Sequence, residues 1–346
     1  MWYVGLDAHL DTTAVSIRNP RGIVTKRSVV PTNRAALRAV LKQARGRMRL
    51  VCESGPLATW IRDTFETRLR EVIVCDRRRT RLTTGAKTDR IDADKLSELA
   101  RRGDMCVVHI PRGDAALLRR YALHYERMQR ERSRIIQRLR SLFFECGLRV
   151  KSPRAQPQRV PLARLGPGAK YVARAYIQKL ETATKLVADA RTTLLDLAAR
   201  APGFDVLQSG PYIGEMRAAQ IIAIAGEPNR FRSLRAFWAY GGLGVLQRVS
   251  SEHRVENGKA VREPHARGIR LRAGQPLLKQ VLRDIALHAS LGRGAFRAAF
   301  DRHLARGKSA AVARVALARK IAAVILAVWR SGEAYVEPSV GQQLSG

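Results

Sequence analysis

The sequence predicts an α/β domain, then a long helical hairpin, then a mainly α-helical C-terminal region. Short β-like runs alternate with helical periodicity through the first 110 residues, two long amphipathic stretches follow, and apolar helices dominate the last third. We place the domain boundaries at residues 1–112, 113–200 and 201–346. For a chain of 346 residues, two or three domains are the usual expectation.

The first domain is predicted to hold a mixed sheet with helices on its faces. Three strand-like runs precede the first helix, and helices and strands then alternate, which is typical of a sheet with antiparallel and parallel neighbours. The predicted strands are Trp2–Leu6, Ala14–Arg18, Ile23–Val30, Arg49–Cys52 and Glu71–Cys75, and Cys106–Ile110 could close the sheet. The predicted helices are Asn33–Ala44, Leu57–Thr67 and Asp92–Arg101.

The middle of the chain predicts two long helices joined by a loop. Apolar residues recur at helical spacing from Asp114 to about Leu148, with arginine on the remaining faces. The stretch Lys151–Gly168, rich in Pro, Gly and Arg, separates this helix from a second one over Ala169–Ala199. Such a hairpin serves either as an oligomerisation element or as an intramolecular spacer, and both alternatives stay open at this stage.

The C-terminal region is predicted to be helical around one extended loop. Leu207–Gly226 has the pattern of a tight turn that runs into an apolar helix. The segment between Gly241 and Gly274 is polar, basic and glycine-containing, and is interpreted as the loop. Further helices are predicted at Ser233–Tyr240, Pro276–Ser290 and Ser309–Trp329.

The charge of the chain points to a polyanionic partner. Its 64 Lys and Arg residues exceed its 29 Asp and Glu residues, for a formal net charge of +35. Because Lys and Arg displace the counterions condensed on phosphates, nucleic acid is the expected partner. Hydrophobic residues make up 46% of the chain, which excludes a disordered basic tail. Aromatic residues make up 6%, so we expect phosphate and shape recognition, which suits duplex DNA and structured RNA, rather than base stacking.

A membrane protein is not expected. Asp7 comes too early for a signal-peptide apolar region. The longest apolar stretch, Ile321–Trp329, is far shorter than the roughly 20 residues that span a bilayer, and is interpreted as a buried helix. The four cysteines are widely spaced without a CxxC pair, which favours neither a disulfide framework nor a zinc knuckle. We expect a reducing, cytoplasmic setting.

Four acids at strand ends and at a helix start form a candidate metal site. Asp7 ends the first predicted strand, Glu53 follows the fourth, and Asp89 and Asp92 share one face of a helix start through their i,i+3 spacing. Carboxylates bind Mg²⁺ (or Mn²⁺), and two such ions about 4 Å apart can promote phosphodiester cleavage. Singly, each acid is more typical of a turn or cap. The set indicates a site, whereas the neighbouring Asp94 is interpreted as a surface or capping residue.

Basic residues and one turn are candidate nucleic-acid contacts. Beside the acids, we expect the basic strip to steer a phosphate backbone rather than to be only a solvated face. The candidates are Arg77, Arg78, Arg79, Arg81 and Lys87 before the acid pair, and Arg262, Arg267, Arg270 and Arg272 near the end of the C-terminal loop. The turn that ends at Gly214 could present backbone N–H groups to a phosphate, with an ordinary helix start as the equally open alternative.

Several segments resemble the IS110 family of insertion-sequence transposases. YVGLDAH around Asp7, CESGP around Glu53 and KTDRIDADKL around Asp89 and Asp92 resemble the N-terminal DEDD, RuvC-like domain of that family. PYIGEMRAAQIIAIAGEPNRFRSLRAFWAYGGLG and RGIRLRAGQPLLKQVL resemble its C-terminal transposase domain. The likeness covers nearly the whole chain in the family's order.

The resemblance implies an RNase H-like first domain in which the four acids bind metal. It also implies a serine nucleophile, which the spacing from Gly242 and Leu243 places at Ser250. Ser251 is the reserve candidate, because it stands where the family usually has glycine. The resemblance further implies a covalent phosphoserine intermediate with DNA, a bound guide (bridge) RNA and a homo-oligomer, either a dimer or a tetramer, as the working form.

We therefore predict a transposase or recombinase of the bacterial cytoplasm or nucleoid that cuts and rejoins DNA to mobilise its own element. Two alternatives stay open. A RuvC-like metal-dependent nuclease or junction resolvase would need the acids but not Ser250. A non-catalytic nucleic-acid-binding protein would show salt-sensitive binding without cleavage.

Overall fold

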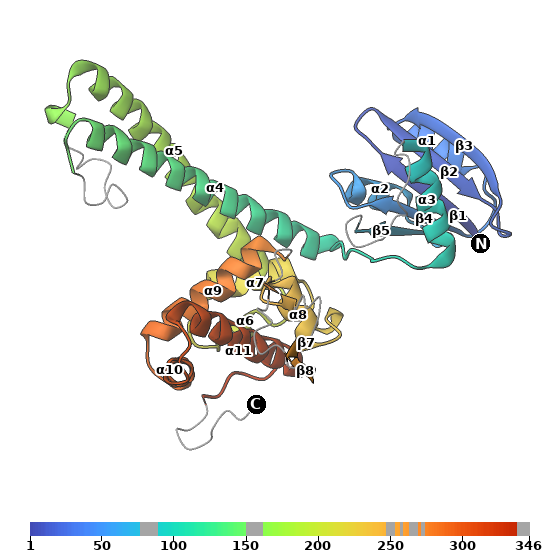
Figure 1. Ribbon diagram of the computed structural model, residues 1–346. Coiled ribbons are helices and arrows are strands. Elements are labelled where there is room, and N and C mark those ends of the chain that lie inside the picture. Colours follow the sequence, from blue (N-terminus) through green and yellow to red (C-terminus); the bar gives the residue numbers. More distant parts are fainter. Residues whose placement is uncertain are drawn as a thin grey trace. The chain divides into compact units, whose positions relative to one another are not determined.

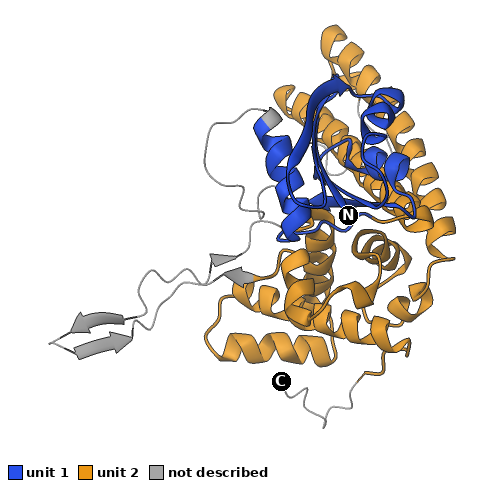
Figure 2. Cartoon of the chain, turned by 90° about the vertical axis from the view of Figure 1, so that its right-hand side faces the viewer, with its two compact units in different colours: residues 1–110 blue, residues 111–346 orange. Residues whose placement is uncertain are grey.

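The structure is a computed structural model in which the chain separates into two units, residues 1–110 and 111–346 (Figure 2). It describes residues 1–76, 89–149, 162–246, 253–256, 259–262, 269–270 and 274–337. The division into three domains at residues 112 and 200 stays a prediction.

A five-stranded sheet forms the first unit. Its strand order is β3-β2-β1-β4-β5, in which β1 pairs antiparallel with β2 and parallel with β4. The strands are β1 Trp2–Ala8, β2 Thr12–Arg18, β3 Val24–Pro31, β4 Met48–Glu53 and β5 Arg70–Cys75, and the helices are α1 Arg34–Leu41, α2 Ala58–Phe65 and α3 Asp89–Arg102. The predicted mixed α/β domain is confirmed. The segment Cys106–Ile110, however, adds a single bridge between Val107 and Cys75 rather than a closing strand.

Different helices cover the two faces of the sheet. The even-numbered Val4 and Leu6 of β1 belong to an apolar core that includes residues of α1 and α2. On the other face, Leu96 of α3 packs with Val51 of β4 in a second core. Since successive side chains of a strand alternate between faces, the odd-numbered residues of β1 lie on the α3 side.

A helical hairpin begins the second unit (Figure 1). Helices α4 (Gly113–Glu145) and α5 (Pro167–Ala198) pack along each other in opposite directions. At one end, Phe143 and Ala173 meet in a small apolar cluster. At the other end, the hairpin joins the main core of the unit through residues such as Leu194.

The rest of the second unit is mostly helical, as predicted. Its helices are α6 Phe204–Gln208, α7 Glu215–Ala225, α8 Leu234–Tyr240, α9 Pro276–Leu291, α10 Ala295–Ala305 and α11 Ala310–Ser331. Helix α10 was not predicted, because it buries only the short stripe Phe296, Ala299 and Phe300. The predicted loop carries two short ladders, of β6 (Val245–Leu246) with β9 (Ile269–Arg270) and of β7 (His253–Glu256) with β8 (Lys259–Arg262).

The longest apolar segment belongs to α11. Ile321, Ile325 and Trp329 are buried in the main core of the second unit, as predicted. Over the residues that the structure describes, no helix has the combination of length and hydrophobicity needed to cross a membrane.

Two arginines fix the C-terminal end of α7. Arg119 of α4 donates to the carbonyl oxygen of Ile224 and to the hydroxyl of Tyr240, both at 3.1 Å. Arg230 donates to the carbonyl of Ala225 and lies over the ring of Tyr240, 4.3 Å from its centroid. Burial lowers the pKa of Arg230, and both cations face the negative end of a helix dipole. These hydrogen bonds join the hairpin to the C-terminal helices at the end of α7.

Candidate active site

The carboxyl ends of two parallel strands bring Asp7 and Glu53 together. The parallel register pairs Leu6 of β1 with Cys52 of β4, so the next residue of each strand lies at the same level. Alternation places both acids on the face that α3 covers. Asp7 is buried, with 8% of its surface exposed, and Glu53 is half-buried.

Helix α3 lies directly on the backbone of β1 because Gly5 has no side chain. A Cβ at Gly5 would stand 2.0 Å from the carbonyl oxygen of Ala93 and 2.5 Å from the amide nitrogen of Ser97. Real Cβ atoms do not approach backbone this closely. The glycine two residues before Asp7 therefore sets how closely α3 approaches the strand.

The first turn of α3 lies at the same edge of the sheet as Asp7. Arg18 of β2 pairs with Tyr3 of β1 and lies 3.6 Å from Glu98 of α3. Ser16 of β2 pairs with Gly5 of β1, and its hydroxyl donates a hydrogen bond to Asp94 of α3. The N-terminus of α3, which carries Asp89 and Asp92, therefore lies at the carboxyl end of β1.

Three of the four predicted acids thus reach one edge of the sheet. Asp92 is 7% exposed, and with Asp7 and Glu126 it makes up the buried carboxylates among the described side chains. Each of the two site acids has a nitrogen nearby: His9 Nε2 at 3.6 Å from Asp7, and the ammonium of Lys95 at 3.7 Å from Asp92. Burying carboxylates is costly unless cations or hydrogen bonds compensate it, so the edge is suited to positive charge.

The donor chemistry of this edge fits a hard divalent cation, which prefers carboxylate oxygens. The described side chains do not close into a complete site, because no group of three or more His, Cys, Asp or Glu among them is arranged to hold a metal. The side chain of Asp89 lies outside the described residues. Metal binding by the four acids stays a prediction.

Cys52 lies in the core beneath α1 and α2, on the face of the sheet opposite the acids. Burial, followed by the neighbouring Cys75 and Glu53, raises the pKa of the Cys52 thiol to about 12. The thiolate is the reactive form, so Cys52 is inert near neutral pH.

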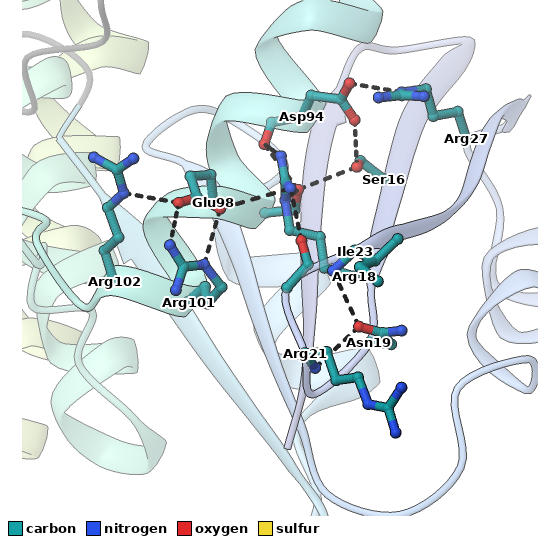
Figure 3. Close-up of polar contacts among 12 residues, drawn as sticks. Ser16, Arg18, Asn19, Arg21, Ile23, Arg27, Asp94, Glu98, Arg101 and Arg102 are labelled. Carbon is teal, nitrogen blue, oxygen red and sulfur yellow. Dashed lines mark hydrogen bonds and ion pairs between the residues drawn. The ribbon is translucent and has the colours of Figure 1, made fainter.

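A polar network ties α3 to the sheet beside the acids (Figure 3). Asp94 accepts hydrogen bonds from the hydroxyl of Ser16 on β2 and, at 2.6 Å, from Nε of Arg27 on β3. Ser97 accepts from Nε of Arg18 at 2.9 Å. Asp94 therefore joins the helix to two strands, a role that its position in the sequence did not indicate.

Glu98 continues the network along α3. Hydrogen bonds from Arg101 and Arg102, together with the charge of Arg18, hold the pKa of Glu98 at about 2. A carboxyl whose folded pKa is depressed stabilises the fold above its unfolded pKa, and this contribution is lost as the pH falls toward 2.

Removing the carboxylate of Asp94 is expected to loosen α3. Asp94→Ala leaves Ser16 and Arg27 without their shared acceptor. We expect the free energy of local unfolding of α3 to fall by about 1–3 kcal/mol, so that its amides exchange hydrogen about 5- to 150-fold faster. Exchange followed by mass spectrometry measures this. Asp104→Ala, at an exposed position after α3, is the matched control and should change nothing. Unchanged exchange in Asp94→Ala would contradict the structural role of the network.

The predicted nucleophiles Ser250 and Ser251 lie outside the described residues, between two described ladders. The register pairs Val245 with Arg270 in one ladder and His253 with Arg262 in the other. The intervening segments, 247–252 and 263–268, are equal in length. Along the sequence, the two ladders therefore lie on either side of the segment that contains both serines.

The chain between Gly242 and Gly274, called the serine segment below, leaves and rejoins the helical domain at one point. A Cβ at Gly274 would lie 2.4 Å from Cα of Gly242, which has φ +65°, so two glycines allow the backbones to touch. The amide of Gln275 donates to the carbonyl of Tyr240 at 2.6 Å. The side chain of Lys279 also lies beside Gly242, 3.0 Å from a Cβ placed at the glycine. The base of the serine segment is thus built into the start of α9.

Both parts of the candidate site fall within matches to known families. A model of transposases of the DEDD, IS110 type matches residues 4–146, and a model described as the transposase IS116/IS110/IS902 family matches residues 205–300. Together they cover about two thirds of the chain. The chain is an IS110-family transposase. No protein of curated function matches it in sequence.

The transposase carries its predicted acids in the first match and both serines in the second. Its activity is that of a DNA recombinase, which cuts and rejoins DNA strands. This confirms the predicted class of enzyme.

The turn before α7 of the transposase is held through the hydroxyl of Tyr212. Gly214 is exposed and precedes the first helical residue, and no side chain caps this helix end. Tyr212 adopts a left-handed conformation with φ +64°, and its hydroxyl accepts from the amide of Arg293 at 3.2 Å. Glu215 places a negative charge in the first turn. Phosphate binding at Gly214 stays a prediction, as does the alternative of an ordinary helix start.

Most of the predicted basic contacts of the transposase are not described. Arg77, Arg78, Arg79, Arg81, Lys87, Arg267 and Arg272 lie outside the described residues. Arg262 ends β8 and Arg270 ends β9, with side chains that are likewise not described. Their roles stay predictions.

Proposed function

We propose that the transposase cuts and rejoins DNA through a divalent metal held by Asp7, Glu53, Asp89 and Asp92 and through Ser250 as nucleophile. The observation that supports this is the edge at which two neighbouring parallel strands and the first turn of α3 each present acids. The RNase H-like character of the first domain is part of the proposal and is consistent with the mixed sheet.

Bound Mg²⁺ or Mn²⁺ would supply positive charge at the scissile phosphate and favour the ionised form of an attacking hydroxyl. The chain itself holds the carboxylates in place. Gly5 lets α3 lie close to β1, and Asp94 ties the helix to β2 and β3, so the acids of strand and helix are held at the same edge of the sheet.

The serine step exchanges one ester for another. Oγ of Ser250 forms a bond to the scissile phosphorus while the bond from that phosphorus to one deoxyribose oxygen breaks. The proton of the serine hydroxyl ends on the released oxygen. Rejoining is the reverse, with a DNA hydroxyl displacing the serine and returning its proton, so no further reactant is consumed.

We also propose a structured guide RNA and a homo-oligomer, a dimer or a tetramer, as parts of the working complex in the bacterial cytoplasm. The net charge of +35 supports binding of a second polyanion besides DNA. Two large apolar side chains near the far end of the hairpin, Phe144 and Tyr171, are 69% and 77% exposed. Exposed apolar side chains of this kind support the hairpin as the assembly element.

A covalent-trapping assay tests the serine proposal. Full-length protein is incubated with end-labelled element-end DNA, the element's RNA and Mg²⁺, and the products are separated on a denaturing gel. We expect a protein–DNA adduct with the wild type and with Ser251→Ala, and none with Ser250→Ala or Asp89→Asn.

Other outcomes favour the alternatives. Cleavage without an adduct, indifferent to both serine variants but abolished in Asp89→Asn, would leave a metal-dependent nuclease. An adduct that disappears in Ser251→Ala alone would move the nucleophile by one residue. Salt-sensitive binding without cleavage under Mg²⁺ or Mn²⁺ would indicate a non-catalytic protein.

A further inference from the structure

Two cavities flank the outer face of α9 and share part of their lining, and together they are called the α9 groove below. Their volumes are about 490 and 800 Å³, and the first is bordered by α4 and α7 and the second by α11. Gln280 and Asp284 line both cavities, so the two cavities adjoin at the outer face of the helix. The α9 side consists of the buried Val281 and of the stripe opposite the core, at i, i+3, i+4 and i+7 spacing: Pro276, Lys279, Gln280, Arg283, Asp284 and Leu287.

The groove is strongly basic. Its six cations come from four helices that are far apart in the sequence: Arg130, Arg134, Arg217, Lys279, Arg283 and Arg314. Of its two acids, Glu126 is paired with Arg130 at 2.9 Å. Within the described part of the chain, Arg134, Lys279 and Arg283 have no carboxylate partner. Positive charge therefore dominates the groove, which suits a phosphate backbone.

Two of the cations are held in place without an acid. Arg217 donates to the carbonyl of Tyr212 at 2.6 Å and lies 3.1 Å from Nδ1 of His288. Arg314 lies over the ring of Phe300, 5.8 Å from its centroid. Cations that are already ordered lose less conformational entropy when a ligand binds.

One end of the groove reaches the base of the serine segment. Lys279, which lines the groove, packs on Gly242, and Gly242 touches Gly274 directly before α9 begins. The chain between these two glycines contains Ser250.

We propose that this groove binds the backbone of duplex DNA and leads it to the base of the segment that carries Ser250. The binding rests on the groove alone, whereas the delivery to Ser250 rests on the proposed function.

The lining favours a duplex over a single strand. Tyr125 is the one aromatic residue among the described lining residues, so the groove offers no platform for successive stacked bases. The amides of Gln129, Gln220 and Gln280 can donate to phosphate oxygens, which fixes position without reading sequence. DNA is the substrate of this enzyme class, and we therefore assign the groove to DNA rather than to RNA.

Salt-dependent binding tests the assignment. Full-length protein is titrated against a fluorescein-labelled DNA duplex of arbitrary sequence at several KCl concentrations, and anisotropy gives the affinity. Arg134→Gln with Arg283→Gln removes two exposed cations and is expected to lower the slope of log affinity against log salt by about 2. Lys42→Gln with Arg45→Gln, two exposed cations of the first unit, makes the same charge change and should keep the wild-type slope.

A photocrosslink gives a second, independent measurement. With p-benzoylphenylalanine in place of Gln280, irradiation is expected to join the protein to the duplex, and with the same group in place of Lys42 it should not. Failure to crosslink at Gln280 together with an unchanged slope in the groove variant would overturn the proposal.

RNA is the competing ligand. The same titrations with a labelled RNA hairpin test whether the groove binds RNA instead. A groove variant that loses RNA affinity but binds duplex DNA with the wild-type slope would overturn the assignment to DNA. Ser250→Ala is expected to bind the duplex with the wild-type slope and yet form no adduct. Failure of the serine proposal and failure of the groove proposal are therefore distinguishable.

Discussion

Replacing Asp7 with asparagine is expected to abolish DNA cleavage and to leave the fold intact. Asparagine keeps the size of the side chain and one acceptor oxygen, but it replaces the second oxygen with an NH2 donor and removes one negative charge from a buried position at the sheet edge. We expect the cleavage rate to fall by at least about a thousandfold, or ~4 kcal/mol, which is the upper range for losing one preorganised electrostatic group. The rate of strand cleavage with Mg²⁺ measures it.

Two further measurements separate a metal ligand from a structural acid. Calorimetric titration with Mn²⁺ should show binding to the wild type that Asp7→Asn weakens strongly, while thermal unfolding without metal stays close to that of the wild type. Asp104→Asn, an exposed acid of the same unit, is the control for both. Wild-type cleavage by Asp7→Asn would refute the metal site at the edge of the sheet.

Gly5→Ala is expected to displace α3 from the sheet. The added methyl would lie 2.0 Å from the carbonyl oxygen of Ala93 and 2.5 Å from the amide of Ser97. Both are backbone atoms of the helix, so no side-chain rotation relieves the overlap. We expect the free energy of unfolding to fall by about 3 kcal/mol or more, which is at or above the upper end for overpacked cores.

This substitution separates placement from chemistry, because it changes none of the four acids. Hydrogen exchange should rise throughout α3, and cleavage should fall as Asp92 moves away from the strand that carries Asp7. Gly55→Ala serves as the stability control, since a Cβ there meets nothing within 4 Å. A Gly5→Ala protein with wild-type stability and wild-type exchange in α3 would show that the helix does not rest on β1.

The sequence by itself determined the elements and the acids within them. Two-residue alternation and helical periodicity are local properties, so the runs that became β1, β4 and the hairpin could be recognised without tertiary contacts. Asp7 and Glu53 were found because each carboxylate directly follows a predicted apolar strand, although both lie within the strands of the structure. The net charge was sufficient to predict a polyanionic partner.

Only the tertiary structure decided which distant residues act together. Asp94 ties α3 to the sheet because the packing of the helix over Gly5 brings it beside Ser16 and Arg27. No spacing within the sequence carries that information. The α9 groove likewise collects cations from α4, α7, α9 and α11, which are far apart in the sequence. Local periodicity shows which face of an element is polar, but electrostatic fields sum over positions in space, which are set only when the helices have packed.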